Sequence, residues 1–235
     1  MNSVKRFLAI LFVAHGLAAV GQQTIIDSLE SSLAMTDSSA ARVDVLCQLS
    51  DQYLAYLPEK AKLYAEEALV LSQKIDYPRG ETLALNRLGE YEFRQSNYAQ
   101  AVQLITRSMQ LAEKRNDSTL MEYAYRVLGN INTAGLKRYD TALRYHLQAL
   151  NIQKKRNTPD RIASSCGSIS WIYAMTNKNL DEGHRLADWG IRLSDSLLHH
   201  QFLAYNYNSK GLLYKQQHEY DSSLQYLILS NQTAQ

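Results

Sequence analysis

The sequence predicts an all-α fold built from repeated helical hairpins, and three observations lead to this fold class. A tyrosine followed three places on by a small residue recurs at Tyr98, Tyr139 and Tyr220, at separations of 41 and then 81 residues. A glycine precedes each of these tyrosines by nine or ten residues. Apolar residues on both sides of each intervening turn follow the period of an amphipathic helix. Together they indicate two-helix units of about 40 residues.

The composition is that of a folded protein rather than a disordered one. Of the 235 residues, 46% are hydrophobic and 20% are charged, which is enough apolar surface for a sizeable core. The three prolines and ten glycines are scattered, so no flexible linker divides the chain. We therefore expect one continuous architecture.

The first 21 residues differ from the rest and predict a secretory signal peptide. The basic start "MNSVKR" is followed by the apolar run "FLAILFVAHGLAAV" and by small residues up to Gly21. A membrane anchor is the alternative, but the apolar run falls short of the roughly 20 residues that span a bilayer. No cysteine stands at the cleavage site to carry a lipid. We expect an exported chain with no membrane span after cleavage.

Cleavage would also change the charge balance. It removes Lys5 and Arg6 and leaves 23 basic and 23 acidic side chains. A neutral chain without a long basic run has no electrostatic footprint for nucleic acid or for an anionic membrane. We therefore expect neither nucleic acid nor an anionic membrane surface as a partner.

The elements follow in order from the hydrophobic pattern. Residues 22–40 predict an N-terminal capping helix and a turn, with Ile26, Leu29 and Leu33 on one side. The repeat array then occupies 41–235. Its units lie near 41–80, 81–120, 121–161, 162–202 and 203–235, and each is read as two helices and a tight turn.

Small residues recur at the same register inside the predicted helices. A glycine within a helix costs about 1 kcal/mol relative to alanine, so Gly89, Gly129 and Gly211 need a compensating gain. Close approach of the two helices of a hairpin supplies it. Ser50 and Ser170 take the glycine place in the first and fourth units. The recurring tyrosines are expected to pack their rings against the preceding unit.

These residues resemble a known repeat. The "LG" pairs at 88–89 and 128–129, the Tyr-x-x-Ala patterns "YAQA" and "YDTA", and Ala149 seven residues after Ala142 are similar to the tetratricopeptide repeat. The resemblance implies a right-handed superhelical solenoid of about five such hairpins. The unit is about 40 residues long instead of 34, which implies longer helices or turns. HEAT and armadillo repeats fit that length better, but neither explains Leu-Gly followed by Tyr-x-x-Ala.

The first unit, 41–80, resembles the opening of the extracytoplasmic arrays of bacterial sensor histidine kinases and transcription regulators. That resemblance implies the bacterial periplasm and a sensory role. In such proteins the array precedes a membrane helix and an output domain. The last predicted helix carries Leu224, Leu227 and Ile228 with no polar cap after it. We therefore expect the front part of a longer array, or self-association through this C-terminal end.

No pattern for catalysis, metal or cofactor binding is found. Cys47 and Cys166 lie three units apart, too far for a disulfide, and are interpreted as core or groove-lining thiols. The histidines, His146 among them, lack ligand spacing and are interpreted as solvated. Acidic pairs such as Glu66 and Glu67 are interpreted as solvated helix faces. No set of residues in the sequence supports an enzymatic function.

The tetratricopeptide resemblance implies where a ligand would bind. By the register of that family, the first helix of each unit lines a concave groove that takes an extended protein or peptide ligand. Amides would pair with its backbone, aromatic rings would cover its side chains, and arginines would meet its carboxylates. The lysine and asparagine set that clamps chaperone tails is not reproduced. For Trp171 a buried core position is an equal alternative, and self-assembly is the alternative function. The implied groove residues are Asn86, Glu90, Phe93, Arg94, Tyr123, Arg126, Asn130, Trp171, Met175, Tyr205, Asn208 and Lys215.

Overall fold

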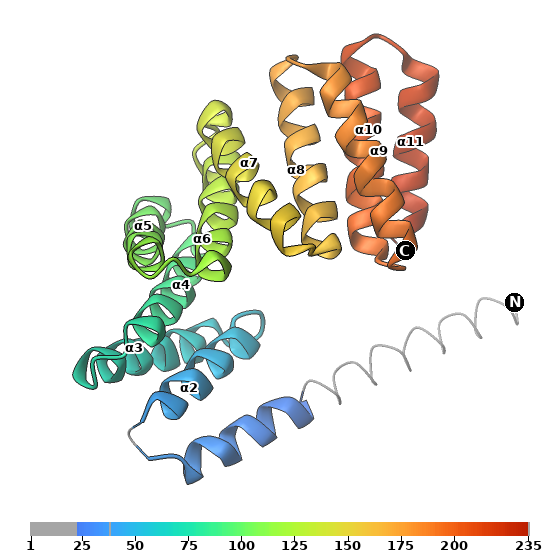
Figure 1. The fold of residues 1–235 in the computed structure, drawn as a ribbon. Coiled ribbons are helices and arrows are strands. Elements are labelled where there is room, and N and C mark those ends of the chain that lie inside the picture. Colours follow the sequence, from blue (N-terminus) through green and yellow to red (C-terminus); the bar gives the residue numbers. More distant parts are fainter. Residues whose placement is uncertain (1–22, 38, 235) are drawn as a thin grey trace, which may run out of the picture. The chain divides into compact units, whose positions relative to one another are not determined.

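The computed structural model describes residues 23–37 and 39–234, and these residues confirm the all-α fold class (Figure 1). The expected signal peptide lies outside them. A helix over residues 23–35 comes first. The helices that follow are α2 (Ala40–Tyr53), α3 (Pro58–Lys74), α4 (Pro78–Arg94), α5 (Tyr98–Lys114), α6 (Ser118–Asn130), the π-helix η1 (Ile131–Gly135), α7 (Tyr139–Arg156), α8 (Pro159–Thr176), α9 (Leu180–Ser196), α10 (His200–Gln216) and α11 (Tyr220–Thr233).

The helices pack as consecutive hairpins, each of which pairs an even-numbered helix with the next odd-numbered one. The even-numbered helices begin at residues 40, 78, 118, 159 and 200, so the unit is about 40 residues long. Proline is the first residue of α3, α4 and α8, where its missing N–H leaves no helical hydrogen bond unmade.

From α3 to α11, each turn between α-helices contains a residue in the left-handed region, and none of these residues is a glycine. Asparagine and aspartate tolerate this region best among the other residues, because their short polar side chains bond locally. Leu198, with φ of 53°, has no such help. The turn residues with positive φ are Asp76, Ser96, Asn116, Lys137, Asn157, Asn177, Asn179, Leu198 and His218.

The chain forms two compact units that divide near Leu111. In the first unit, Ile26 packs in a cluster with Leu49 and Tyr53 of α2, and Leu29 and Leu33 border it. A polar contact joins the same helices: Glu30 accepts hydrogen bonds from the Tyr53 hydroxyl at 2.7 Å and from Lys60 at 2.8 Å. The helix over 23–35 is therefore fixed to α2 and α3 by both kinds of contact.

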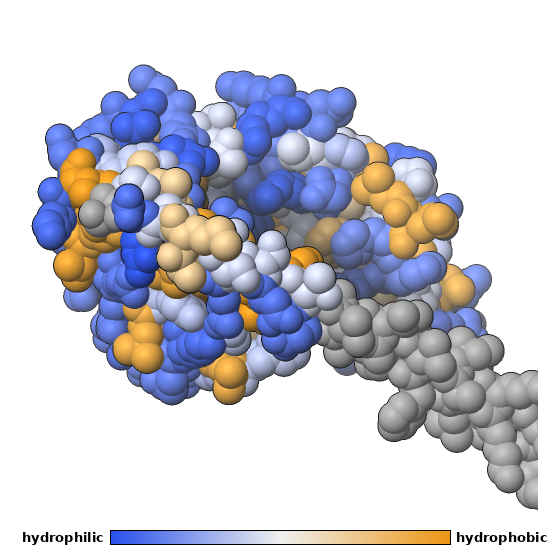
Figure 2. Space-filling model, turned by 90° about the horizontal axis from the view of Figure 1, so that it is seen from below, coloured by the Kyte–Doolittle hydropathy of each residue, from blue (hydrophilic) through white to orange (hydrophobic). Residues whose placement is uncertain are grey.

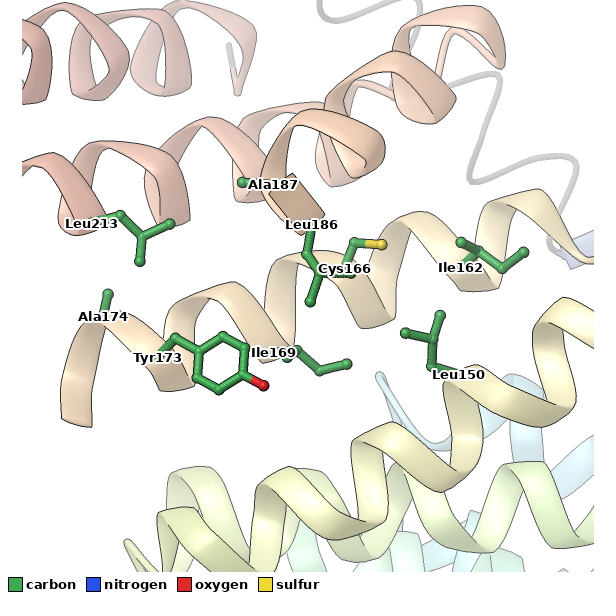
Figure 3. Close-up of a cluster of buried hydrophobic side chains, with 9 residues drawn as sticks. All are labelled: Leu150, Ile162, Cys166, Ile169, Tyr173, Ala174, Leu186, Ala187 and Leu213. Atoms are coloured by element: carbon green, nitrogen blue, oxygen red, sulfur yellow. The ribbon is translucent and has the colours of Figure 1, made fainter. Parts of the chain in front are cut away.

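In the second unit, the largest buried cluster lies around α8. Figure 3 shows Leu150 of α7 pointing toward α8, while the side chains of α9 and α10 approach α8 from the other side. Both cysteines are core residues: Cys166 is in this cluster and Cys47 is in the core of the first unit. Burial raises the pKa of each thiol to about 12. The cluster consists of Leu150, Ile162, Cys166, Ile169, Tyr173, Ala174, Leu186, Ala187 and Leu213.

The expected close approach at the recurring glycines is confirmed. A methyl group on Gly89 would lie 2.5 Å from Cδ1 of Ile105, and one on Gly211 would lie 2.9 Å from Cγ of Leu227. On Gly129 it would meet the ring of His146 at 2.7 Å. In each hairpin the odd-numbered helix inserts one side chain where the partner helix has none. A larger residue at the glycine would push the two helices apart.

The expected packing of the tyrosine rings against the preceding unit is wrong for all three. The ring of Tyr139 meets Trp171 of α8, in the following hairpin, with centroids 5.9 Å apart. Tyr98 contacts Phe93 of its own hairpin, and Tyr220 is 63% exposed. For Tyr139 the reason is that α7 packs against α8 of the following hairpin.

Candidate functional site

The candidate site is centred on α6 in the second unit. Tyr123, Arg126 and Asn130 follow one another at i, i+3 and i+7, so they share one side of the helix, and each is half-buried. The opposite side carries Ala124 and Leu128, which are fully buried. The core packing of α6 therefore fixes the direction in which the three polar side chains point.

Arg126 has a defined position on this side. Its guanidinium carbon lies 4.9 Å from the centroid of the Tyr123 ring, within the range of a cation–π contact. Within residues 39–234, no carboxylate forms an ion pair with Arg126. A half-buried guanidinium that is held against a ring and not neutralised can bind a carboxylate through two parallel hydrogen bonds.

The side chains of α8 come next in the same unit. Trp171 is half-buried and meets Tyr139 edge-on, with an interplanar angle of 67°. Its exposed part leaves an aromatic surface for a ligand, so Trp171 is neither a buried core ring nor a free one. Met175 packs at the border of the buried cluster around α8.

The third helix of this face, α10, contributes less than the sequence suggests. The ring of Tyr205 covers Gly167 of α8, where a methyl group would lie 2.6 Å from its Cδ1. Burial raises the pKa of Tyr205, and a hydrogen bond with Ser168 opposes that shift. Tyr205 thus serves mainly as a contact between α8 and α10. Asn208 is half-buried and Lys215 is exposed, so both are open to a ligand.

In the first unit, α4 holds the remaining predicted residues, and one of them is misplaced. Asn86 is 2% exposed, and its Oδ1 accepts a hydrogen bond of 2.6 Å from Ser108 of α5. It lies inside the hairpin, because its position on α4 turns toward α5, and it is not accessible to a ligand. Phe93 is half-exposed beside Tyr98, and Arg94 is exposed.

The charges on α4 are already paired, in contrast to α6. Arg87 lies 2.5 Å from Asp51 of α2 and 3.6 Å from Glu90. Arg94 lies 3.9 Å from the same Glu90 carboxylate. The accessible side of α4 is therefore neutralised within the unit, whereas that of α6 keeps a positive charge.

Three residues that support α6 carry no signal in the sequence pattern. Glu122 of α6 has a fully buried side chain, which accepts hydrogen bonds from Gln153 of α7 at 2.7 Å and from Arg161 of α8 at 2.9 Å. Buried carboxylates are uncommon, and this one is tolerated because both oxygens are hydrogen-bonded. The contact joins three helices and holds the helix that carries Arg126.

His146 was expected to be solvated, and this expectation is wrong. Its side chain fills the space over Gly129 and is 1% exposed. Neither ring nitrogen has a hydrogen-bond partner within the described chain. Burial, together with the nearby charge of Arg126, lowers the pKa of His146 to about 4. The ring is therefore neutral at physiological pH and takes the role that Ile105 has in the preceding hairpin.

Among the residues that the structure describes, no group of three or more His, Cys, Asp or Glu side chains could hold a metal ion. None of the described helices is long and apolar enough to cross a membrane. The structure brings together Tyr123, Arg126 and Asn130 as the most complete set of accessible polar groups. Extended peptides are bound by such a combination of ring, guanidinium and amide.

These features define the class of protein: an all-α solenoid of consecutive helical hairpins, with half-buried polar and aromatic side chains on α6, α8 and α10. The family model of the tetratricopeptide repeat matches residues 81–155, which run from α4 to the end of α7. Over this segment the chain is therefore similar to tetratricopeptide repeats. A search of the curated proteins finds no match.

Several solved structures share the fold. BtubC (BKLC) from P. vanneervenii is 14% identical with a TM-score of 0.72, and the match covers 92% of this chain and 89% of that one. Aspartyl phosphate phosphatase F from Bacillus subtilis is 12% identical, with a TM-score of 0.69 and coverage of 91% and 68%. A Rap protein complexed with competence and sporulation factor is 14% identical, with a TM-score of 0.70 and coverage of 93% and 73%. At these identities the likeness shows the fold alone.

Proposed function

We propose that this chain is a non-catalytic scaffold that binds an extended protein or peptide segment along α6, α8 and α10, with Arg126 receiving a carboxylate. The observation that carries the proposal is the unneutralised guanidinium held against Tyr123, beside the amide of Asn130. The Rap protein of similar fold, solved with competence and sporulation factor, supports a ligand of this kind.

The remaining chemistry fits a binding role better than catalysis. The thiols of Cys47 and Cys166 are buried, with pKa values of about 12, and a thiol of that kind is a poor nucleophile. The buried Glu122 is occupied by Gln153 and Arg161. These groups support the helices and do not face a ligand.

A random-peptide library displayed on phage tests the proposal. The wild-type protein should enrich peptides that carry a carboxylate, and Arg126→Glu should reduce their recovery by a factor of about 10 or more, since charge-assisted contacts contribute about 1.5–3 kcal/mol. Arg144→Glu, on an exposed position of α7, is the matched control and should bind normally. Equal recovery with Arg126→Glu, or no enrichment by the wild type, would overturn the proposal.

We also propose that the chain is exported to the bacterial periplasm and forms the sensory part of a signalling system. The support is the leader-like composition of residues 1–21 and the resemblance of 41–80 to extracytoplasmic sensor arrays. N-terminal sequencing of the protein from a bacterial periplasmic fraction should begin near residue 22. Recovery from the cytoplasm with Met1 intact would contradict export.

A further inference from the structure

The middle of α8 presents one large side chain outside the core. Within residues 162–174 three residues are not buried, and they stand at i, i+4 and i+7 on one side of the helix: Ser164, Ser168 and Trp171. The two serines are small, so an extended chain can approach the helix closely beside them. Trp171 is therefore the one ring that this part of α8 offers to a bound chain.

The position of the Trp171 ring is fixed by its neighbours. Tyr139 of α7 meets it edge-on at 5.9 Å between centroids, and Met175 follows one turn later at the border of the buried cluster. A side chain that is held in place before binding costs less entropy to order. On the face shown in Figure 2, apolar residues form small patches within a mostly hydrophilic surface. A fixed, half-buried ring suits a single large apolar side chain of a ligand.

The charges on the same side of α6 and α8 select an acidic ligand. The half-buried residues on this side hold one guanidinium, that of Arg126, and no carboxylate. Arg161, at the start of α8, already pairs with the buried Glu122. The residues concerned are Tyr123, Arg126, Asn130, Ser164, Ser168 and Trp171.

The repeat register gives the separation between Arg126 and Trp171. The contact between Glu122 and Arg161 shows that α6 and α8 are neighbours, and neighbouring helix axes lie about 10 Å apart. Since Gly129 and Ser170 are equivalent, Trp171 stands four places farther along its helix than Arg126 does along α6, which adds about 6 Å in height. An extended chain covers the resulting distance of about 12 Å in three or four residues.

We propose that the ligand is a segment in which an acidic residue and a large apolar residue stand about three or four positions apart, with the carboxylate on Arg126 and the apolar side chain on Trp171. This inference rests on the proposed peptide-binding function and adds to it a second contact and a spacing. Trp171 is then the residue that determines specificity. A segment with the carboxylate alone binds more weakly, by a factor of about 10, because it leaves the ring uncovered.

Titration calorimetry with synthetic peptides tests the spacing. Each peptide is capped at both ends and holds one glutamate and one phenylalanine, in either order, separated by increasing numbers of serines. The wild-type protein should bind best with about two or three serines between them, and replacing the phenylalanine with serine should cost a factor of about 10 in affinity. Trp171→Ala should lose this preference and keep the dependence on glutamate. Trp189→Ala is the matched control, since Trp189 of α9 is also half-buried but lies beside Lys154.

Tryptophan fluorescence tests the same contact without removing the ring. Trp171 and Trp189 are the two tryptophans of the chain, so Trp189→Phe leaves Trp171 as the reporter. Its emission should shift to shorter wavelength with the best peptide and stay unchanged with the peptide that lacks phenylalanine. In Trp171→Phe the emission of Trp189 should not respond.

The outcomes separate this inference from the function on which it rests. If no glutamate peptide binds, or if Arg126→Glu binds as the wild type does, the peptide-binding function itself is wrong. If binding requires Arg126 but depends neither on the phenylalanine nor on its spacing, only the present inference is overturned. Equal loss of affinity in Trp171→Ala for peptides with and without phenylalanine would also overturn it, because that result would reflect a change in the fold.

Discussion

The α4–α5 and α6–α7 hairpins have the same register but enclose different chemistry. In the first, Ile105 fills the space over Gly89; in the second, His146 fills the space over Gly129. The hydroxyl of Thr82 donates a hydrogen bond to the carbonyl of Pro78. The equivalent position forty residues later holds the buried carboxylate of Glu122. The backbone pattern therefore sets where two helices meet. The side chain at the contact decides whether that hairpin responds to pH.

The largest expected effect breaks the feature that the two hairpins share. Gly89→Leu should lower the free energy of unfolding by about 3 kcal/mol, because the added side chain has no space beside Ile105. Urea unfolding followed by circular dichroism measures the change. Gln103→Leu, at an exposed position of α5, should stay within about 0.5 kcal/mol of the wild type. Equal stability of Gly89→Leu and the wild type would contradict close helix contact.

The next prediction concerns the contact between His146 and Gly129, which distinguishes the α6–α7 hairpin from the α4–α5 hairpin. The pKa of His146 is lowered from 6.5 to about 4 in the folded protein, so the unfolded chain binds the proton first as pH falls. The stability from neutral His146 is therefore complete above about pH 6.5 and is lost progressively down to about pH 4, by about 3 kcal/mol in total.

His146→Ile, which copies the first hairpin, should lack this part of the acid sensitivity. Urea unfolding at a series of pH values from neutral to acid compares the two proteins. Carboxylates titrate equally in both, so the difference between the two curves isolates the histidine. Parallel curves would show that His146 is protonated without cost and is not buried as described.

A smaller effect concerns the buried carboxylate. Gln153→Ala removes one of the two donors to Glu122 and should lower the free energy of unfolding by about 2 kcal/mol, the cost of leaving a buried acceptor short of a partner. Gln148→Ala, on the exposed side of the same helix, should change it by less than about 0.5 kcal/mol. Thermal melting of both variants distinguishes them, and equal melting would contradict the contact.

The smallest effect lies in a turn. Leu198 has a left-handed backbone and is 77% exposed, whereas the equivalent turn residues Asn116, Asn157 and Asn177 suit that conformation. Leu198→Asn should raise the stability by about 0.5 kcal/mol. Differential scanning calorimetry measures the shift. A lower melting temperature would mean that the Leu198 side chain makes a stabilising contact.

The repeat itself could be predicted from sequence because its signals are local and periodic. The prolines at 58, 78 and 159 and the glycines at 89, 129 and 211 each report one backbone requirement. The close contacts at those glycines followed from the cost of glycine in a helix. The expected peptide-binding role of individual residues stays a prediction.

The site was harder to predict because helix register alone does not give burial. Asn86 and Arg126 hold the same place in successive units, yet Asn86 is inside its hairpin and Arg126 is half-exposed. Glu122 and His146 are polar residues in buried places, and only their partners in three dimensions show why they are tolerated. A periodic pattern does not contain that information.

The pairing of each glycine with one inserted side chain also implies a rule of complementary volumes. Where the even-numbered helix has glycine, the partner position holds Ile105, His146 or Leu227; where it has Ser50 or Ser170, the partner position holds Ala65 or Ala187. A larger residue on the even-numbered helix is thus paired with a smaller one on the odd-numbered helix. Related chains should therefore exchange these residues in pairs, and a serine at 129 should be accommodated once residue 146 has shrunk to alanine.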